Sequence, residues 1–241
     1  MPCSPVAAHD RCGNVLGRFM NEPETDDRRK ETRGAAPQSD ISRLKFGAVI
    51  LAAGASTRMG APKQLIEIER KPLLVRAVEA ALGSPAWPVV VVLGANAEKI
   101  RPSLARLPVL VTENSAWAEG MAASIRAGIM TLQQFSRRLD AALIALCDQP
   151  AFSTDTIEQL LAAHRRTGRS IVAAHYAGRH GAPALFLREH FQTLVGLTGE
   201  EGARALLNDN PDRIASVDLP NLAIDLDTPQ DVAGLNKPIQ S

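Results

Sequence analysis

The chain has 241 residues, a formal net charge of +1 and a hydrophobic fraction of 45%. This length and composition suit one α/β domain with a sizeable core, and the balanced charge excludes a broad basic surface for nucleic acid or for a membrane. Only 4% of the residues are aromatic, which argues against a protein that stacks single-stranded bases on aromatic platforms.

Residues 1–44 are rich in charged residues, Pro and Gly and show no hydrophobic period, so we expect a disordered N-terminal extension. The extension lacks the apolar core of a secretory signal, and no stretch of the chain approaches the roughly 20 apolar residues of a membrane span. Cys3, Cys12 and Cys147 form no metal-binding spacing and suit a reducing compartment. We therefore expect a cytoplasmic protein whose folded part is residues 45–241.

From Lys45 onward, short apolar runs alternate with segments of helical periodicity. Strands are predicted within residues 46–54, 88–94, 108–114, 140–150 and 170–176, and helices within residues 72–83, 97–107, 119–135 and 154–168. Continuous β-branched runs such as Val89–Val92 are typical of parallel strands that are buried on both faces. The alternation predicts a single Rossmann-like α/β domain of three layers with a mostly parallel sheet. Ligands of such sheets bind outside the carboxyl ends of the strands, so the residues after each apolar run are the candidates for function.

The loop after the first predicted strand has the composition of a phosphate-binding loop. It reads LAAGASTRMGAPKQL over residues 51–65, in which Gly54 and Gly60 allow close backbone approach and small neighbours leave N–H groups available to an anion. The Arg58 guanidinium can donate two parallel hydrogen bonds to phosphate oxygens, and Lys63 offers a mobile positive charge. The spacing fits neither GxxxxGK[ST] nor GxGxxG. We interpret the loop as a cradle for a triphosphate; a plain surface turn is the alternative.

Two later segments carry carboxylates where packing does not require them. Asp148 follows a buried apolar run in the sequence CDQP, and its oxygens suit a hard cation such as Mg²⁺; a turn or helix N-terminal aspartate is the alternative. Near the C-terminus, IDLDTPQDV places Asp225 and Asp227 at a predicted strand end, while Thr228 and Asp231 suit the start of a helix. Aspartates that end separate strands at one edge of a sheet would together make one cation site.

The segment LAAGASTRMGAPKQL resembles the L-A-[AG]-G-x-S-x-R-M-G-x-x-K signature of the nucleotidyltransferases that act on molybdenum cofactor, and is most similar to the cytidylyltransferases among them. The resemblance continues through ENSAWAEGMAASIRAG, CDQP, RHGAPALF and IDLDTPQDV, over residues 45–236. It implies a nucleotidyltransferase domain of glycosyltransferase-A-like fold over residues 45–241. It also implies transfer of CMP from CTP to the phosphate of molybdopterin, with release of pyrophosphate and with Mg²⁺ as the cofactor.

The resemblance also implies roles for single residues. Arg58, Lys63 and Asp148 would be catalytic, and Asp148 and Asp227 would bind the metal. Nucleotide binding is implied for Leu51, Ala52, Ala53, Gly54, Ser56, Arg58, Met59, Gly60, Lys63, Gly94, Gly120, Met121 and Ser124. Acceptor binding is implied for Arg179, His180 and Gly181.

Some of these positions also have plain structural interpretations. Gly94 fits a strand-ending turn, Met121 and Trp117 fit core or lid positions, and residues 179–180 fit a solvated hairpin. No chemistry is assigned to the segment GEEGARALL, residues 199–207.

Ala53 favours CTP over GTP, because cytidylyl enzymes of the family tend to carry LAAG where guanylyl enzymes carry LAGG. Its methyl group would also narrow the space beside the base. The expected partners are CTP or GTP, a phosphorylated molybdopterin, and a molybdoenzyme that receives the product; no nucleic acid or membrane partner is expected.

Three other functions remain open. They are a GTP-using guanylyltransferase of the same family, a nucleotidyltransferase for a sugar or polyol phosphate, and a non-catalytic chaperone module that hands the cofactor to a partner enzyme. A module of the last kind would be expected to lack Lys63 or the aspartates, and the chain carries both.

Overall fold

The computed structural model describes residues 44–57, 59–200, 202–208 and 213–224. All of them belong to Asp40–Ser241, one of the two compact units into which the chain divides. The predicted extension, apart from Leu44, and the predicted helix after Thr228 lie outside the described residues.

A seven-stranded sheet forms the centre of the domain, with the strand order β5-β4-β1-β6-β8-β7-β9. The strands are β1 (Phe46–Ala52), β4 (Val89–Leu93), β5 (Leu110–Glu113), β6 (Ala141–Leu146), β7 (Ile171–Tyr176), β8 (Arg179–Leu187) and β9 (Ile214–Asp218). Neighbouring strands pair in parallel except where β8 pairs with β6 and β7. A two-stranded sheet, β2 (Glu67–Ile68) and β3 (Lys71–Pro72), stands apart from the main one.

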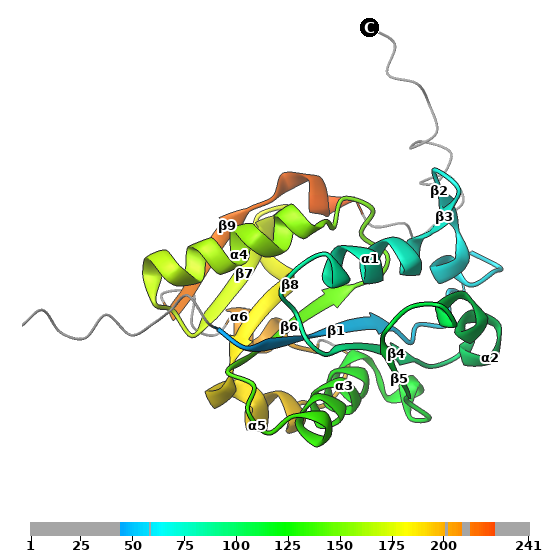
Figure 1. Cartoon of the computed structure of the whole chain (residues 1–241), viewed down its shortest axis with the longest axis horizontal. Helices are drawn as coiled ribbons and strands as arrows, with labels where there is room; N and C mark the ends of the chain where they lie inside the picture. Colours follow the sequence, from blue (N-terminus) through cyan, green and yellow to red (C-terminus); the bar gives the residue numbers. More distant parts are fainter. Residues whose placement is uncertain (1–43, 58, 201, 209–212, 225–241) are drawn as a thin grey trace, which may run out of the picture. The chain divides into compact units, whose positions relative to one another are not determined.

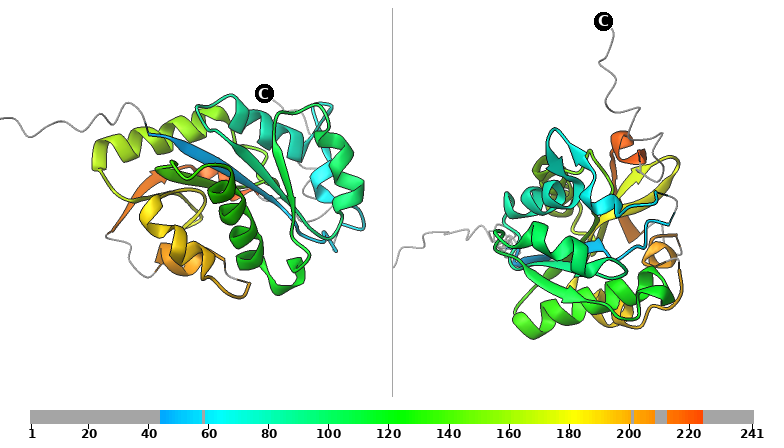
Figure 2. Two further views of the ribbon diagram at one scale, coloured as in Figure 1. Left: turned by 60° about the horizontal axis from the view of Figure 1, so that its bottom comes forward. Right: turned by 90° about the vertical axis from the view of Figure 1, so that its right-hand side faces the viewer.

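Helices cover both faces of this sheet, which gives three layers (Figures 1 and 2). One face carries α1 (Leu73–Leu82) and α4 (Thr154–Thr167), and the other carries α3 (Met121–Phe135), α5 (Phe191–Val195) and α6 (Arg204–Asn208). The short helix α2 (Ala97–Ile100) follows β4. The predicted α/β class with a mostly parallel sheet is therefore confirmed.

The strand and helix sequences account for this arrangement. Strand β4 is buried along its whole length, as a run of valines between two helical layers requires. Helix α4 begins at a capping box in which the Ser153 hydroxyl and the Thr156 backbone and side chain bond reciprocally, and it ends at Gly168 in the left-handed conformation. These local signals set the two ends of the helix that packs against β7, β8 and β9.

Strand β8 runs against the direction of the others because a tight hairpin joins it to β7. Ala177 and Gly178 both have positive φ, 49° and 73°, the conformation that two-residue hairpin turns favour. The reversal brings the first residues of β8 beside the carboxyl end of β6, because Ile144 pairs with Ala184 and Ala141 with Leu187. No helix in the described part of the chain is long and apolar enough to cross a membrane.

Candidate active site

The loop after β1 is held in shape by Gln64, which lies in the short 3₁₀ helix η2 (Lys63–Leu65). The Gln64 side chain is 1% exposed. Its Nε2 donates to the carbonyl oxygens of Ala52 and Gly54 at 3.1 and 3.0 Å. Its Oε1 accepts from the Ser56 hydroxyl at 3.3 Å, and the Lys63 N–H donates to the same hydroxyl at 3.0 Å. One buried amide thus ties the whole turn to the segment that carries Lys63.

All the carbonyl oxygens of residues 52–55 accept hydrogen bonds from the protein. Besides the two bonds from Gln64, the Ala95 N–H donates to the Ala53 carbonyl at 3.2 Å, and the Asn96 side chain donates to the Ala55 carbonyl at 3.3 Å. In a trans peptide the N–H points away from the C=O. The N–H groups that follow these carbonyls therefore face away from the protein donors, as the predicted binding of an anion would require.

Lys63 and Asp148 face each other across the carboxyl ends of β1 and β6. The Lys63 Nζ lies 2.5 Å from Asp148 Oδ2, and each side chain is 16% exposed. The other carboxylate oxygen, Asp148 Oδ1, is buried and has no hydrogen-bond partner among the residues that the structure describes. A buried carboxylate oxygen without a partner is unfavourable in the free protein and suits a ligand that brings a cation or a donor. Arg58 and Asp227 lie outside the described residues.

A cavity of about 690 Å³ opens between the loop after β1 and the start of α3. Several predicted nucleotide-binding residues line it: Leu51, Ala52, Ala53, Gly54, Lys63, Gly120, Met121 and Ser124. Further lining comes from Ala55, Thr57, Gln64, Trp117, Ala118, Leu146, Cys147, Asp148 and Glu200. The cavity therefore has the charged residues Lys63 and Asp148 in its lining together with Ala53 and Trp117.

The remaining predicted nucleotide-binding residues in the described part of the chain, Ser56, Met59, Gly60 and Gly94, are not among the lining residues. Ser56 and Met59 shape the loop, since the Met59 N–H donates to the Ser56 carbonyl at 3.0 Å. Gly94 packs behind the wall: a Cβ there would lie 2.8 Å from the Cβ atoms of both Ala53 and Trp117. Its lack of a side chain is thus required by packing.

Buried side chains and one glycine set the start of α3. The Asn114 Nδ2 donates to the Ser124 Oγ at 3.1 Å, and both side chains are buried. Gly120 has φ 103°, and a Cβ there would lie 2.7 Å from the Gly199 carbonyl oxygen. The loop before α6 therefore rests against the first turn of α3 and brings Glu200 to the cavity.

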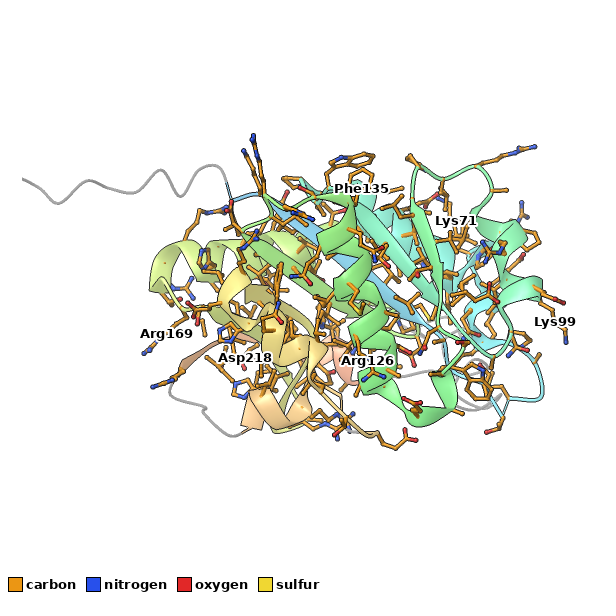
Figure 3. All side chains as sticks on the ribbon, turned by 90° about the horizontal axis from the view of Figure 1, so that it is seen from below. Lys71, Lys99, Arg126, Phe135, Arg169 and Asp218 are labelled. Atoms are coloured by element: carbon orange, nitrogen blue, oxygen red, sulfur yellow. The ribbon has the colours of Figure 1, made fainter. Side chains whose placement is uncertain are left out.

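Arg126, on the side of α3 that faces the viewer in Figure 3, also holds this loop. It donates to the Leu197 carbonyl at 3.4 Å and pairs with Glu119 at 3.2 Å. The segment of residues 199–207, to which the sequence assigned no chemistry, thus contributes Glu200 to the lining of the cavity.

Gln149 is a second buried amide that the sequence pattern left without a role. It follows Asp148 and is 2% exposed. Its Nε2 lies within hydrogen-bond distance of the Tyr176 hydroxyl (3.0 Å), the Ala182 carbonyl (3.1 Å) and the Leu222 carbonyl (3.3 Å). It connects the loop of Asp148 to the β7–β8 hairpin and to the 3₁₀ helix η7 (Pro220–Ala223).

Cys147 and His180 are both electrically neutral near pH 7. Burial, reinforced by the charge of Asp148, raises the pKa of the Cys147 thiol far above its usual range, so the residue stays protonated and is no nucleophile. Partial burial, with the neighbouring His175, lowers the pKa of His180. The His180 ring lies 2.6 Å from the Ser216 hydroxyl.

A second, mostly apolar cavity of about 40 Å³ lies next to the first and shares Leu51, Met121 and Leu146 with it. Two of the predicted acceptor-binding residues, Arg179 and Gly181, line it, but His180 does not. Arg204 of α6 lies on the same wall and was missed from the sequence. Within the described residues, neither Arg179 nor Arg204 has an ion-pair or hydrogen-bond partner for its guanidinium.

The family model for the MobA-like NTP transferase domain matches residues 48–215. The chain belongs to the MobA-like NTP transferase family. Its match includes the loop after β1, the Asp148 loop and the β7–β8 hairpin, so all the residues that line the two cavities lie within the family domain. The predicted family and the predicted enzyme class, a nucleotidyltransferase, are confirmed.

Curated relatives of this MobA-like protein carry different names. A nicotine blue oxidoreductase of Paenarthrobacter nicotinovorans is 34% identical over 174 residues, which are 68% of this chain and 81% of the relative. A molybdenum cofactor guanylyltransferase of Vibrio parahaemolyticus is 29% identical over 192 residues, 77% of this chain and 92% of the relative.

Among solved structures, Rv0371c of Mycobacterium tuberculosis H37Rv aligns with a TM-score of 0.69 and 25% identity, and the alignment covers 80% of this chain and 97% of that one. A 4-diphosphocytidyl-2C-methyl-D-erythritol synthase of Anaerococcus prevotii has the same fold, with a TM-score of 0.64, 14% identity and coverage of 81% and 96%.

A MobA-like nucleotidyltransferase takes a nucleoside triphosphate as a substrate and generally depends on a divalent metal ion. Within the described residues, no cluster of three or more His, Cys, Asp or Glu side chains is placed to hold a metal. Asp148, whose Oδ1 has no partner among the described residues, is a carboxylate that suits such an ion, which would need further oxygens from its substrates.

Proposed function

We propose that this protein transfers CMP from CTP to the phosphate of a molybdopterin, with release of pyrophosphate and with Mg²⁺ as the cofactor. The observation that carries the proposal is the Lys63–Asp148 pair beside the loop after β1, at one end of a cavity whose wall also includes Ala53, Trp117 and Met121. A nucleoside triphosphate has the same division, an anionic chain at one end and a base at the other.

Asp148 and Asp227 are the residues that would hold Mg²⁺. The buried, unpartnered Oδ1 of Asp148 fits this role, and Mg²⁺ in nucleotide enzymes needs only one or two protein carboxylates beside the phosphates. The ion would supply neutralisation of charge on the phosphate oxygens.

The protein residues chiefly position the substrates and stabilise charge. An oxygen of the acceptor phosphate attacks the α-phosphorus, the new P–O bond forms as the bond to the leaving oxygen breaks, and pyrophosphate departs. The N–H groups of the loop, Lys63 and Arg58 would bind the triphosphate and stabilise the negative charge of the leaving group. The acceptor phosphate is already ionised, so the reaction needs no general base.

The nucleobase preference is inferred from Ala53. The side chain lines the cavity and is 8% exposed, so its methyl group occupies space in the wall beside the base position. A pyrimidine needs less room there than a purine. The relative named as a guanylyltransferase makes GTP the second candidate substrate.

The acceptor site is inferred from the second cavity. At about 40 Å³ the cavity itself is smaller than a pterin. The inference therefore rests on Arg179 and Arg204, whose guanidinium groups have no partner among the described residues and suit an anionic group. Molybdopterin combines a pterin with a phosphate.

The test is to incubate the protein with Mg²⁺ and each of CTP, GTP, ATP and UTP, with and without molybdenum-loaded molybdopterin, and to measure pyrophosphate. Release with CTP and the pterin together supports the proposal. Release of pyrophosphate with GTP instead would show that the protein is a guanylyltransferase. Release with a sugar or polyol phosphate would overturn the proposed acceptor. Binding of the pterin without pyrophosphate release would indicate a chaperone.

A further inference from the structure

Trp117 is the large aromatic side chain in the wall of the nucleotide cavity. It opens the 3₁₀ helix η4 (Trp117–Glu119), which follows the carboxyl end of β5, and it is 37% exposed. In the part of the chain that the structure describes, the indole has no aromatic partner and no hydrogen bond. This partly exposed side chain in the cavity lining can therefore contact a ligand.

The position of Trp117 is set by close packing against the loop that begins with Ala53. A Cβ on Gly94 would lie 2.8 Å from the Cβ atoms of Ala53 and of Trp117, so these two residues meet over a glycine that leaves room for both. Ala53 and Trp117 consequently form one continuous piece of the cavity wall. The charged pair of Lys63 and Asp148 belongs to the same cavity.

We propose that Trp117 stacks on the base of the bound nucleoside triphosphate, beside the methyl group of Ala53. This inference rests on the proposed nucleotide substrate and adds the residue that binds its base. Stacking on an aromatic face is tolerant of base identity. Trp117 therefore supplies affinity for the nucleoside in general, while the space beside Ala53 decides between pyrimidine and purine.

The chain contains two tryptophans, which makes the test direct. Trp87 precedes β4 at the opposite end of the sheet, is 57% exposed and packs edge-on against Phe135 at a ring distance of 6.1 Å. In the Trp87→Phe protein the tryptophan fluorescence comes from Trp117 alone. Titration with Mg²⁺ and CTP should quench this fluorescence, whereas inorganic tripolyphosphate with Mg²⁺, which has no base, should leave it unchanged.

Calorimetric titration then separates stacking from a structural role. Trp117→Leu should weaken CTP binding by about 10- to 100-fold, the range expected for loss of one base–aromatic contact, and leave tripolyphosphate binding unchanged. Trp117→Phe should retain most of the CTP affinity, and Trp87→Leu should retain all of it.

Equal weakening of CTP and tripolyphosphate in Trp117→Leu would overturn the inference, because it would show damage to the phosphate loop. An unchanged affinity for CTP would overturn it as well. Neither measurement includes an acceptor, so the stacking role is tested even if molybdopterin proves to be the wrong acceptor. A protein that binds none of the four triphosphates would overturn both proposals.

Discussion

Two buried amides, Gln64 and Gln149, hold the loops of the site through hydrogen bonds to backbone carbonyls. Each is almost fully buried, and each bridges segments that are separate in the sequence. Such bonds are costly to remove, because the carbonyls left behind stay buried and unpaired. We therefore expect these residues to matter for catalysis although neither is charged.

Replacement of Gln64 by methionine tests this expectation, since methionine keeps the length of the side chain and removes both donors. The carbonyls of Ala52 and Gly54 would lose their partners, so the loop should lose its anion-binding shape. We expect the KM for the nucleotide to rise at least about 10-fold, the effect of about 1.4 kcal/mol, as measured by initial-rate kinetics. Gln134→Met, at an exposed position of α3, is the matched control. An unchanged KM would refute the role of Gln64.

Lys63 carries the positive charge nearest to the candidate catalytic carboxylate. Lys63→Ala should lower kcat by about 10²–10³, as expected for loss of one electrostatic contact to a developing negative charge. Pyrophosphate release under saturating substrates is the measurement. The control is Lys71→Ala, because Lys71 forms an exposed ion pair with Glu79 at 2.7 Å. Near-normal turnover of the Lys63 variant would remove it from the catalytic residues.

Lys63 and Asp148 could be predicted as candidate site residues because both are charged and both follow buried apolar strands. Gln64 and Gln149 could not, because an amide finds its partners through tertiary structure; the bond from Gln149 to the Leu222 carbonyl spans 73 residues. Arg204 was missed for a related reason, since only the docking of the loop before α6 against α3 brings it to the second cavity.

Among the elements, the contact between the start of α3 and the loop of residues 197–200 places Met121 and Glu200 in the lining of the first cavity. It depends on Gly120, whose φ of 103° is strained for other residues and whose missing Cβ makes room for the Gly199 carbonyl. The regular elements around it were predictable from hydrophobic periodicity. This irregular contact was not, because nothing local in the sequence pairs residue 120 with residue 199.

Gly120→Ala should destabilise the protein by roughly 1–3 kcal/mol, because strain at a positive φ adds to a steric clash. Urea unfolding followed by circular dichroism measures the change. Gly196→Ala is the matched control: Gly196 has φ −80° and a Cβ there would have ordinary contacts, 3.4 Å being the shortest. Equal stability of the two variants would show that the loop adapts freely to the added methyl group.

At the scale of the whole molecule, a ligand that binds only the folded state raises the free energy of unfolding by mass action. At a CTP concentration 100 times its Kd, the free energy of unfolding rises by about 2.7 kcal/mol, which corresponds to a rise in Tm of roughly 5–11 °C for a chain of this size. We expect this rise in thermal unfolding experiments with Mg²⁺ present, and a smaller rise when EDTA removes the metal. In Asp148→Asn the difference between the two conditions should disappear. A full Mg²⁺ effect in that variant would place the ion elsewhere.

The reversed strand β8 has a consequence for how such a domain can diversify. The loop after β1, for which we propose phosphate binding, follows a strand that leads into a crossover, whereas Arg179 and Gly181 follow a turn of only two residues, Ala177 and Gly178. A hairpin turn of this kind can change its length or its sequence while the parallel strands and their helices stay in place. The half of the site proposed for the triphosphate and the half proposed for the acceptor can therefore evolve separately. Exchange of one short surface turn among relatives is a route to a new acceptor with the same nucleotide chemistry.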